Sequence, residues 1–486
     1  MRRTKIIATL GPATNDAKML DKIIDAGVDV VRINFSHGSS EGHIEIVERL
    51  RNRARAHGRQ VGVLADLQGP KIRIERFTDG KVDLQEGENF ALDTAHDAKA
   101  GNKDIVGMAY KSLPDDVKRG DTLLLDDGRI VLWVDSVEGT RVNCRVVVGG
   151  ILSDRKGLNR QGGGLSAKAL TEKDKEDIIT AVKMKCDYVA ISFPRSAADV
   201  EEARELVTQA GGQADIISKI ERADALENID EIIQASDAIM IARGDLGVEI
   251  GDAALPPVQK RLIRQGRASN RIVITATQMM ESMIENAIPT RAEVFDVANA
   301  VLDGTDAVML SAETASGRYP DKAIAAMDRI CVEAEKQREV MQSDHRINKT
   351  FQRIDEAIAM SAMYTANHLK VKAIAALTES GSTTRWMSRI SSGIPIYALT
   401  SYVETRRKVT LYRGVYPVSF EVSSDDRAVV NQEAIDELLR RGAVRDGDLV
   451  VITRGDLLGV QGGTNAMNIV RVGDLDMSRD PDGKLQ

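Results

Sequence analysis

Charged and hydroxyl side chains follow two short apolar runs in a pattern that indicates a reactive centre. In VRINFSH, Arg32, Asn34 and Ser36 occupy alternate positions, and in ISKIE the alternate positions are Lys219 and Glu221. Residues two apart in a strand point to the same side. A lysine beside a glutamate can also be a buried ion pair that only supports the fold, but buried charges are rarely retained for stability alone. We therefore interpret these residues as candidates for catalysis.

A second carboxylate and two hydroxyls follow other apolar runs. ARGDLGVEI contains Gly244 and Asp245, ITATQMMESM contains Thr277, and MLSAETASGRYP contains Ser311. Asp245 and Glu221 together offer carboxylate oxygens of the kind that hold Mg²⁺ or Mn²⁺. The glycine lets backbone N–H groups approach an anion, although an ordinary strand-to-helix turn has the same composition. This set suits phosphoryl transfer, and the chain has neither a Walker A motif nor the HRD and DFG motifs.

Eight apolar runs rich in β-branched residues must position these side chains, and segments with a helical pattern separate most of them. Near-continuous apolar strands between helices indicate a parallel sheet covered by helices, and eight such units favour an α/β fold of the closed (β/α)₈ TIM barrel type. Active sites of such barrels lie at the carboxyl ends of the strands. The predicted strands are 5–10, 28–35, 61–67, 187–193, 215–221, 237–243, 271–277 and 306–311.

Two further regions interrupt or follow the barrel pattern. The gap between the third and fourth runs is too long for a loop, and its strand patterns at 81–94, 121–139 and 140–150 predict an inserted all-β domain. After residue 345, a helix at 354–370 and strands at 372–378, 395–400, 414–420, 448–454 and 468–473 predict a C-terminal α/β domain. We expect a catalytic barrel from 1–70 and 168–345, a β-barrel lid domain from 71–167, and a regulatory domain from 346–486.

The composition restricts the class of protein. The chain has 486 residues, a net charge of −7 and a pI of about 5.6, which argues against a basic nucleic-acid-binding surface. No run approaches the roughly 18 consecutive apolar residues that span a membrane. Cys144, Cys186 and Cys331 are odd in number and form no CxxC pair, which is typical of reduced thiols in the cytoplasm. We expect a cytoplasmic enzyme that binds neither nucleic acid nor membrane.

Six segments resemble the pyruvate kinase family in sequence and in order. They are RINFSHG, ADLQGPKIR, ISKIE, ARGDLGVEI, TATQMMESM and AVMLSAETASGRYP, and the resemblance extends over essentially the whole chain. It implies a Mg²⁺-dependent pyruvate kinase that transfers the phosphoryl group of phosphoenolpyruvate to ADP, giving pyruvate and ATP in the last step of glycolysis. It also implies allosteric control through the C-terminal domain and a homotetramer.

The same resemblance implies a role for each candidate residue. Lys219 would neutralise the phosphoryl group in flight, Arg32 would hold it, and Glu221 and Asp245 would ligate Mg²⁺. The amides of Gly244 and Asp245, with the Thr277 hydroxyl, would receive the pyruvate carboxylate. The candidates for the proton relay to carbon are Thr277 and Ser311, and the residues near the nucleotide phosphates would be Asn34, His37, Arg73 and Lys156. His37 can instead cap a turn, and Lys156 can belong to a solvated charge cluster.

The segment DLQGPKIR departs from the family pattern, which reads close to DTKGPEIR. Leu67, Gln68 and Lys71 stand where the pattern has threonine, lysine and glutamate. Many members bind K⁺ beside the phosphate, and the other residues of that K⁺ site are retained here as Asn34, Ser36 and Asp66. A fixed ammonium at Lys71 would supply the charge that K⁺ otherwise brings, so we expect activity that does not require K⁺.

The C-terminal region contains a candidate effector loop, LTESGSTTRWMSR at 377–389, and VQGGTNAMNIVRVG at 460–473 matches a second effector-loop region of the family. Small hydroxyl residues and glycine between a strand and a helix suit a phosphate group, and the candidates are Thr378, Ser380, Gly381, Ser382 and Thr383. Glu379 stands where members that respond to fructose 1,6-bisphosphate often have a basic residue. We therefore expect a monophosphate effector, a sugar monophosphate or AMP, while a loop retained without regulation is the alternative.

Two other functions fit parts of the pattern. A phosphotransferase similar to pyruvate phosphate dikinase would need a phosphorylatable histidine in a mobile domain, and none of the six histidines has that setting. A metabolite sensor without activity on the same fold would be expected to have lost Lys219, Glu221 or Asp245, and all three are present.

Overall fold

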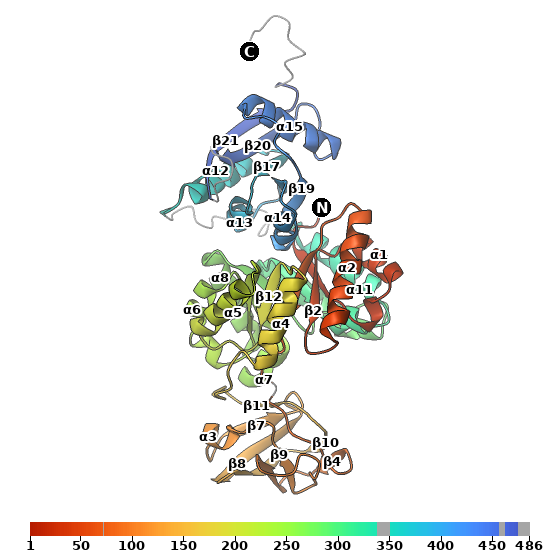
Figure 1. Ribbon diagram of the computed structural model, residues 1–486, viewed down its shortest axis with the longest axis vertical. Helices are drawn as coiled ribbons and strands as arrows, with labels where there is room; N and C mark the ends of the chain where they lie inside the picture. The colour runs from red at the N-terminus through yellow and green to blue at the C-terminus, as the bar shows by residue number, and fades with distance from the viewer. Residues whose placement is uncertain (71, 338–349, 456–461, 475–486) are drawn as a thin grey trace, which may run out of the picture.

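The computed structural model describes residues 1–70, 72–337, 350–455 and 462–474, so Lys71 and the first two residues of the 460–473 segment lie outside the described residues. Three bodies follow one another along the long axis of the molecule (Figure 1): the C-terminal α/β sheet, the barrel in the middle, and the inserted β-sheet at the far end. The chain begins beside the C-terminal sheet.

Eight parallel strands close into a barrel, as the sequence predicts. In chain order the strands are β1 (Lys5–Thr9), β2 (Val30–Asn34), β3 (Gly62–Asp66), β12 (Tyr188–Ile191), β13 (Asp215–Ile220), β14 (Ala238–Ala242), β15 (Ile272–Ala276) and β16 (Ala307–Leu310). Hydrogen-bonded neighbours follow the order β1-β16-β15-β14-β13-β12-β3-β2, and β2 closes the circle onto β1. Each strand lies within the predicted run.

Helices cover the outside of the barrel. They are α1 (Ala17–Asp25), α2 (Ser40–Ala56), α4 (Glu172–Lys183), α5 (Ala197–Gln209), α6 (Ile229–Ala235), α8 (Leu255–Ala268), α9 (Arg291–Asp303) and α11 (Pro320–Ala334). Two buried clusters divide the strand residues by parity: Val189 and Ile191 pack with the helices, whereas Tyr188 and Ala190 face the interior. Because side chains alternate along a strand, Ser192, which follows β12, continues the interior row at the mouth.

The inserted domain joins the barrel between β3 and α4. A six-stranded sheet has the order β11-β7-β8-β9-β5-β6, and β10 pairs with β4. The strands are β4 (Lys81–Leu84), β5 (Asn89–Asp93), β6 (Ile105–Gly107), β7 (Thr122–Leu125), β8 (Ile130–Glu138), β9 (Arg141–Val148), β10 (Gly150–Ser153) and β11 (Leu158–Arg160), with the short helix α3 (Leu113–Asp116). A separate apolar core that includes Phe90 and Leu132 holds this domain together.

Aspartates mark the amino ends of several barrel strands. The Asp187 carboxylate accepts a hydrogen bond of 2.8 Å from the Val63 amide, and Asp306 accepts one of 2.9 Å from Val273. In both cases the donor belongs to the neighbouring strand of the barrel. The carboxylates therefore tie adjacent strands together at the end opposite the mouth.

The C-terminal domain docks onto these aspartates with basic side chains. Arg389 lies 2.5 Å from Asp306 with both side chains almost fully buried, and Lys408 lies 2.7 Å from Asp215, at the start of β13. The interior cluster of the barrel continues without a break into this domain, where Met363 belongs to it. The barrel is therefore closed at its amino end by the C-terminal domain.

The C-terminal sheet has the order β19-β18-β17-β20-β21, with only β21 antiparallel to its neighbour among the described strands. Its strands are β17 (Ala373–Leu377), β18 (Ile396–Thr400), β19 (Val415–Ser419), β20 (Leu449–Gly455) and β21 (Thr464–Arg471), and its helices are α12 (Ile354–Leu369), α13 (Ser382–Ser388), α14 (Val403–Lys408) and α15 (Arg427–Arg440). The sequence predicts that β21 begins at residue 468, four residues late, because polar residues of an edge strand hide the alternation. Within the described part of the chain, no helix is long and apolar enough to cross a membrane.

Candidate active site

A cavity of about 380 Å³ opens at the carboxyl ends of the barrel strands. Barrel residues that line it include Arg32, Asn34, Ser36, Asp66, Ser192, Lys219, Glu221 and Asp245. The inserted domain contributes the opposite wall, with Arg73, Asp126, Asp127 and Lys156. Residues far apart in the sequence thus meet in one concave, strongly charged space between two domains.

Lys219 lies at the centre of this charge cluster. Its Nζ is 2.8 Å from Glu221 Oε1, 3.3 Å from Asp66 Oδ1 and 2.8 Å from Ser192 Oγ. Burial alone would lower the pKa of Lys219, but the two carboxylates raise it above its usual value, so the side chain stays charged. Lys219 and Glu221 do form an ion pair, but this pair is part of a larger network that faces a cavity.

Asp66 holds both cations of the site in place. Its Oδ2 is 2.6 Å from Arg32 Nε, and its side chain is 1% exposed. Burial raises the pKa of Asp66, but Lys219 and Arg32 lower it more, so the carboxyl group stays ionised. Arg32 also donates a hydrogen bond of 3.1 Å to Thr9 Oγ1. The guanidinium is therefore fixed from two sides and presents its remaining N–H groups to the cavity.

Glu221 and Asp245 bring two carboxyl groups to the same cavity. The pKa of Glu221 is raised to about 7, mainly by burial, with the negative charge of Asp245 acting in the same direction and Lys219 opposing them. Burial likewise raises the pKa of Asp245. Lys219 is the cation that lowers the pKa of both carboxyl groups, but burial outweighs it in each case, so a further positive charge would be favourable here. A divalent cation, which prefers oxygen ligands, would supply that charge. These residues therefore fit the predicted Mg²⁺ or Mn²⁺ site.

Thr277 and Gly244 face each other across the ends of β15 and β14, where α7 (Arg243–Ile250) begins. The Gly244 amide donates a hydrogen bond of 2.8 Å to Thr277 Oγ1, which itself donates to the Ala276 carbonyl. Ser311, just after β16, has a buried hydroxyl with no hydrogen-bond partner among the described residues. Thr277, Gly244 and Ser311 are not among the described residues that line the cavity.

The residues predicted near the nucleotide divide into two groups. Asn34, Arg73 and Lys156 line the cavity, and Lys156 Nζ lies 2.7 Å from Asp126 Oδ1. Asn34 uses its Oδ1 to accept a hydrogen bond of 3.0 Å from the Ser36 amide. His37 is exposed, and it does not belong to the described residues of the cavity wall.

Several residues of the site were not predicted from the sequence. Ser192 follows β12 with the same alternation of side chains that places Lys219 on β13. The alternation rule that identified Lys219 would therefore also have identified Ser192. Thr9 anchors Arg32, and Asp126 and Asp127 reach the cavity from a turn in the inserted domain, where both have positive φ values of 49° and 58°. The DDG sequence signals a turn, but nothing local indicates that this turn meets the barrel mouth.

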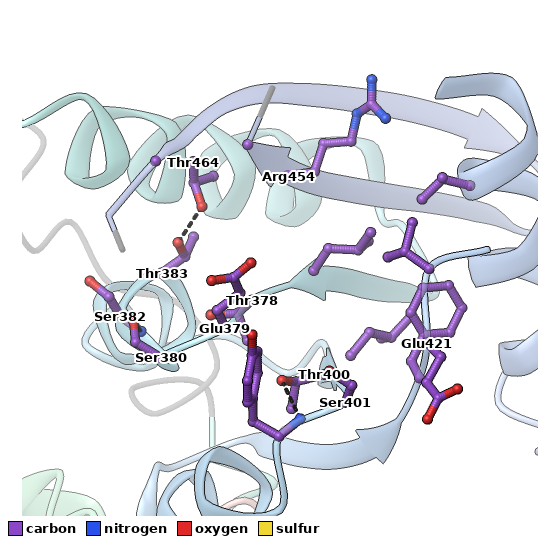
Figure 2. Close-up of a pocket in the computed structure, with 18 of the residues that line it drawn as sticks. Thr378, Glu379, Ser380, Ser382, Thr383, Thr400, Ser401, Glu421, Arg454 and Thr464 are labelled. Atoms are coloured by element: carbon purple, nitrogen blue, oxygen red, sulfur yellow. Dashed lines mark hydrogen bonds between the residues drawn. The ribbon is translucent and has the colours of Figure 1, made fainter. Parts of the chain in front are cut away.

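A second and larger cavity, of about 780 Å³, lies in the C-terminal domain (Figure 2). Four of the five predicted effector residues, Thr378, Ser380, Ser382 and Thr383, line it, whereas Gly381 does not. Gly381 has a left-handed φ of 82° directly before α13, and its amide donates to Thr378 Oγ1. Figure 2 shows the hydroxyl residues gathered around Glu379 at one side of the cavity and Glu421 at the other.

Comparisons with known proteins agree over both halves of the chain. A family model described as the barrel domain of pyruvate kinase matches residues 1–324, and one described as the alpha/beta domain of pyruvate kinase matches residues 356–470. The chain is 55% identical over 476 residues to pyruvate kinase II of Salmonella typhimurium, and the alignment covers 97% of this chain and 99% of that relative. It is also 55% identical over 459 residues to a pyruvate kinase of Haemophilus influenzae, covering 94% and 96%. Among solved structures, a pyruvate kinase from Cryptosporidium parvum superimposes with a TM-score of 0.90 at 35% identity, over 97% of this chain and 96% of that one.

Proposed function

The chain belongs to the pyruvate kinase family, so it transfers the phosphoryl group of phosphoenolpyruvate to ADP, and we propose that the cavity around Lys219 is the place of this transfer. The observation that carries the proposal is the convergence of two cations and three carboxylates, Arg32, Lys219, Asp66, Glu221 and Asp245, on one cavity. Phosphoryl transfer depends on positioning and on neutralising charge, and this cluster supplies both.

Each side chain of the cluster has a distinct part in the proposed reaction. Arg32 binds the phosphate, and Lys219 neutralises the phosphoryl group as it leaves the enol oxygen for the β-phosphate of ADP. Glu221 and Asp245 would hold Mg²⁺, which would supply positive charge to the phosphate and pyruvate oxygens. Asn34, Arg73 and Lys156 lie where they can contact the nucleotide, and their place on the cavity wall supports this assignment. His37 is the least supported member of that set because it is exposed.

The second half of the reaction is the delivery of a proton to the enolate carbon. We assign Thr277 and Ser311 to this relay, and the amides of Gly244 and Asp245, together with the Thr277 hydroxyl, to the carboxylate of pyruvate. The Thr277 hydroxyl is already held beside Gly244, at the point where β14 turns into α7. The Ser311 hydroxyl has no hydrogen-bond partner in the described ranges of the chain, so it is available to accept and donate a proton.

The inserted domain is proposed to act as a lid on this cavity. Its contacts with α7 run through Glu249, which accepts hydrogen bonds from Asn159 at 3.3 Å and, through its carbonyl, from the Gly162 amide at 3.0 Å. Because Lys156 and Asp127 belong to the lid, closure would bring them to the nucleotide and exclude water. The proposed domains are a barrel from 1–70 and 168–345, a lid from 71–167 and a regulatory domain from 346–486. The enzyme is proposed to be cytoplasmic.

The K⁺ site of the family is proposed to be replaced here by a fixed charge. Asn34, Ser36 and Asp66 line the cavity, and so do Pro70 and Ile72, which flank Lys71 in the sequence. The described residues on both sides of Lys71 in the sequence therefore lie at this cavity, which supports the proposal. A lysine needs no exchangeable cation, so turnover would proceed without K⁺.

The second cavity is proposed to bind a monophosphate effector, a sugar monophosphate or AMP. Hydroxyl groups around Ser380 suit one phosphate, while the Glu379 carboxylate on the same wall would repel a second one. Arg427 and Arg454 are basic residues among those that line this cavity. The Glu379 carbonyl accepts a hydrogen bond from Thr405, in the helix that docks onto the barrel, so the cavity wall is in contact with the element that joins the two domains.

A homotetramer is the proposed assembly because two separate apolar faces are exposed. One is around α9, where Ile288 is 74% and Phe295 is 70% exposed. The other is on α12, with Ile354 and Tyr364. If each face pairs with the same face of a second copy, two such faces on one chain generate a closed tetramer.

Replacement of Lys219 tests the catalytic assignment. In a coupled assay with phosphoenolpyruvate, ADP and Mg²⁺, we expect Lys219→Met to lower kcat by about 10²–10³-fold, because the charge on the moving phosphoryl group is no longer neutralised. Lys175→Met is the matched control, since Lys175 also pairs with a glutamate, Glu172 at 2.7 Å, but on the exposed surface of α4. A wild-type protein that forms no pyruvate would contradict the proposal.

The K⁺ proposal predicts full activity in tetramethylammonium buffer. Lys71→Glu is expected to lose at least tenfold in activity there and to regain most of it when K⁺ is added, because the carboxylate restores a cation site. The measurement is kcat against K⁺ concentration for both proteins. Activity of the wild type that collapses without K⁺ would sink the idea.

Titration with phosphorylated ligands tests the effector site. We expect ribose 5-phosphate, glucose 6-phosphate or AMP to lower the half-saturating phosphoenolpyruvate concentration several-fold, and fructose 1,6-bisphosphate to have little effect. Thr378→Val should abolish the response, Glu379→Lys should create one to the bisphosphate, and Thr208→Val on α5 should change neither. If none of the ligands shifts the saturation curve, the loop is retained without regulation.

Sedimentation velocity tests the assembly. We expect a species of four chains of 53.0 kDa each. Phe295→Glu should yield a smaller species because a charge replaces a large apolar side chain at one interface only. A wild-type monomer at micromolar concentration would rule out this assembly.

A further inference from the structure

Arg243, the first residue of α7, makes an unusual set of contacts with the end of β15. Its Nε lies 3.3 Å from the Ala276 carbonyl oxygen and 3.2 Å from that of Thr277. Its Nη2 lies 2.7 Å from the Thr277 carbonyl oxygen and 3.1 Å from that of Gln278. Three consecutive carbonyls therefore converge on one buried guanidinium, which is 6% exposed.

The other side of the same guanidinium is also occupied. Its Nη1 donates a hydrogen bond of 2.7 Å to Asp296 Oδ1 on α9 and one of 3.4 Å to Gln259 Oε1 on α8. All the N–H groups of Arg243 thus have protein acceptors, and none is directed to a ligand. The side chain is held by two helices and in turn holds the chain segment after β15.

The segment that Arg243 holds has a backbone conformation that its residues rarely adopt. Thr277 and Gln278 have φ values of 64° and 53°, both in the left-handed region. A β-branched residue such as threonine is a clear outlier there, so surrounding contacts must enforce the conformation. The carbonyls that point to Arg243 are that of Ala276, directly before this left-handed pair, and those of both residues of the pair.

The left-handed turn determines where the Thr277 hydroxyl lies. In this conformation Thr277 Oγ1 is 2.8 Å from the Gly244 amide nitrogen, and Gly244 directly follows Arg243 in the chain. One arginine therefore fixes both partners of this contact: its backbone leads into Gly244, and its side chain holds the turn that carries Thr277.

We propose that Arg243 is a positioning residue for phosphoenolpyruvate turnover, which acts by holding the left-handed turn at Thr277 and Gln278. This inference rests on the proposed function, which assigns the Thr277 hydroxyl to the substrate carboxylate and the proton relay. Arg243 itself does not touch substrate. A lysine cannot replace it, because a single ammonium lacks the planar fork that reaches three carbonyls and two helices together.

The test asks whether relieving backbone strain at Gln278 restores the activity that is lost when Arg243 is replaced. We expect Arg243→Lys to lower kcat/KM for phosphoenolpyruvate by about 10²-fold, the scale of a small misplacement of a reacting group, with the KM for ADP changed less than twofold. Gln278→Gly should restore at least tenfold of this loss in the double variant, because glycine adopts positive φ without strain. Gln278 is exposed, so Gln278→Gly alone should stay within twofold of the wild type.

Arg51→Lys is the matched control for loss of a guanidinium. Arg51 also donates to two backbone carbonyls, those of Met184 and Lys185, but on the outside of the barrel, so we expect no change beyond twofold. If Arg243→Lys stays within twofold of the wild type, or if Gln278→Gly restores nothing while Thr277→Val is impaired, the inference is wrong and the proposed function stands. If Thr277→Val keeps full kcat/KM, the assigned role of Thr277 falls, and this inference falls with it.

Discussion

The arrangement of the barrel mouth depends on one buried carboxylate, Asp66, placed between two cations. Arg32 and Lys219 come from strands on either side of β3 and β12, and their positive charges would repel each other in a buried site. Asp66 contacts both, so that each charge is retained and directed to the cavity. Taking an unpaired ion out of water costs several kcal/mol. The contacts of Asp66 that place Arg32 and Lys219 at the cavity are therefore the same contacts that offset the cost of burying their charges.

The opposite end of the barrel uses the same physics for a different purpose. Aspartates at the amino ends of the strands accept backbone hydrogen bonds within the barrel and pair with basic side chains of the C-terminal domain, as Asp187 does with Val63 and with Arg407. Arg407 belongs to α14, which also contacts the wall of the effector cavity through Thr405 and Glu379. The cavity proposed for an effector is therefore connected to a barrel strand by a short chain of polar contacts.

Much of the fold and the centre of the site could be predicted because they follow from local patterns. Apolar runs identified all eight barrel strands, and the alternation of side chains along a strand was enough to place Lys219 and Glu221 side by side. Asp126 and Asp127 were missed because a turn in the inserted domain has no local sign that it faces the barrel. Ser192 was missed although its signal was present. Lys71, on which the K⁺ prediction depends, lies outside the described residues and stays a prediction.

The sequence by itself determined which side chains share one side of each strand, since a period of two is a property of the extended backbone alone. It also determined the order of the strands along the chain and the family resemblance that gave each residue an expected role. Only the tertiary structure decided which of those strands became neighbours, and hence that Asp66 meets Lys219. It likewise decided that Arg243 holds the turn at Thr277, because contacts between segments distant in sequence depend on barrel closure and packing, which no local pattern encodes.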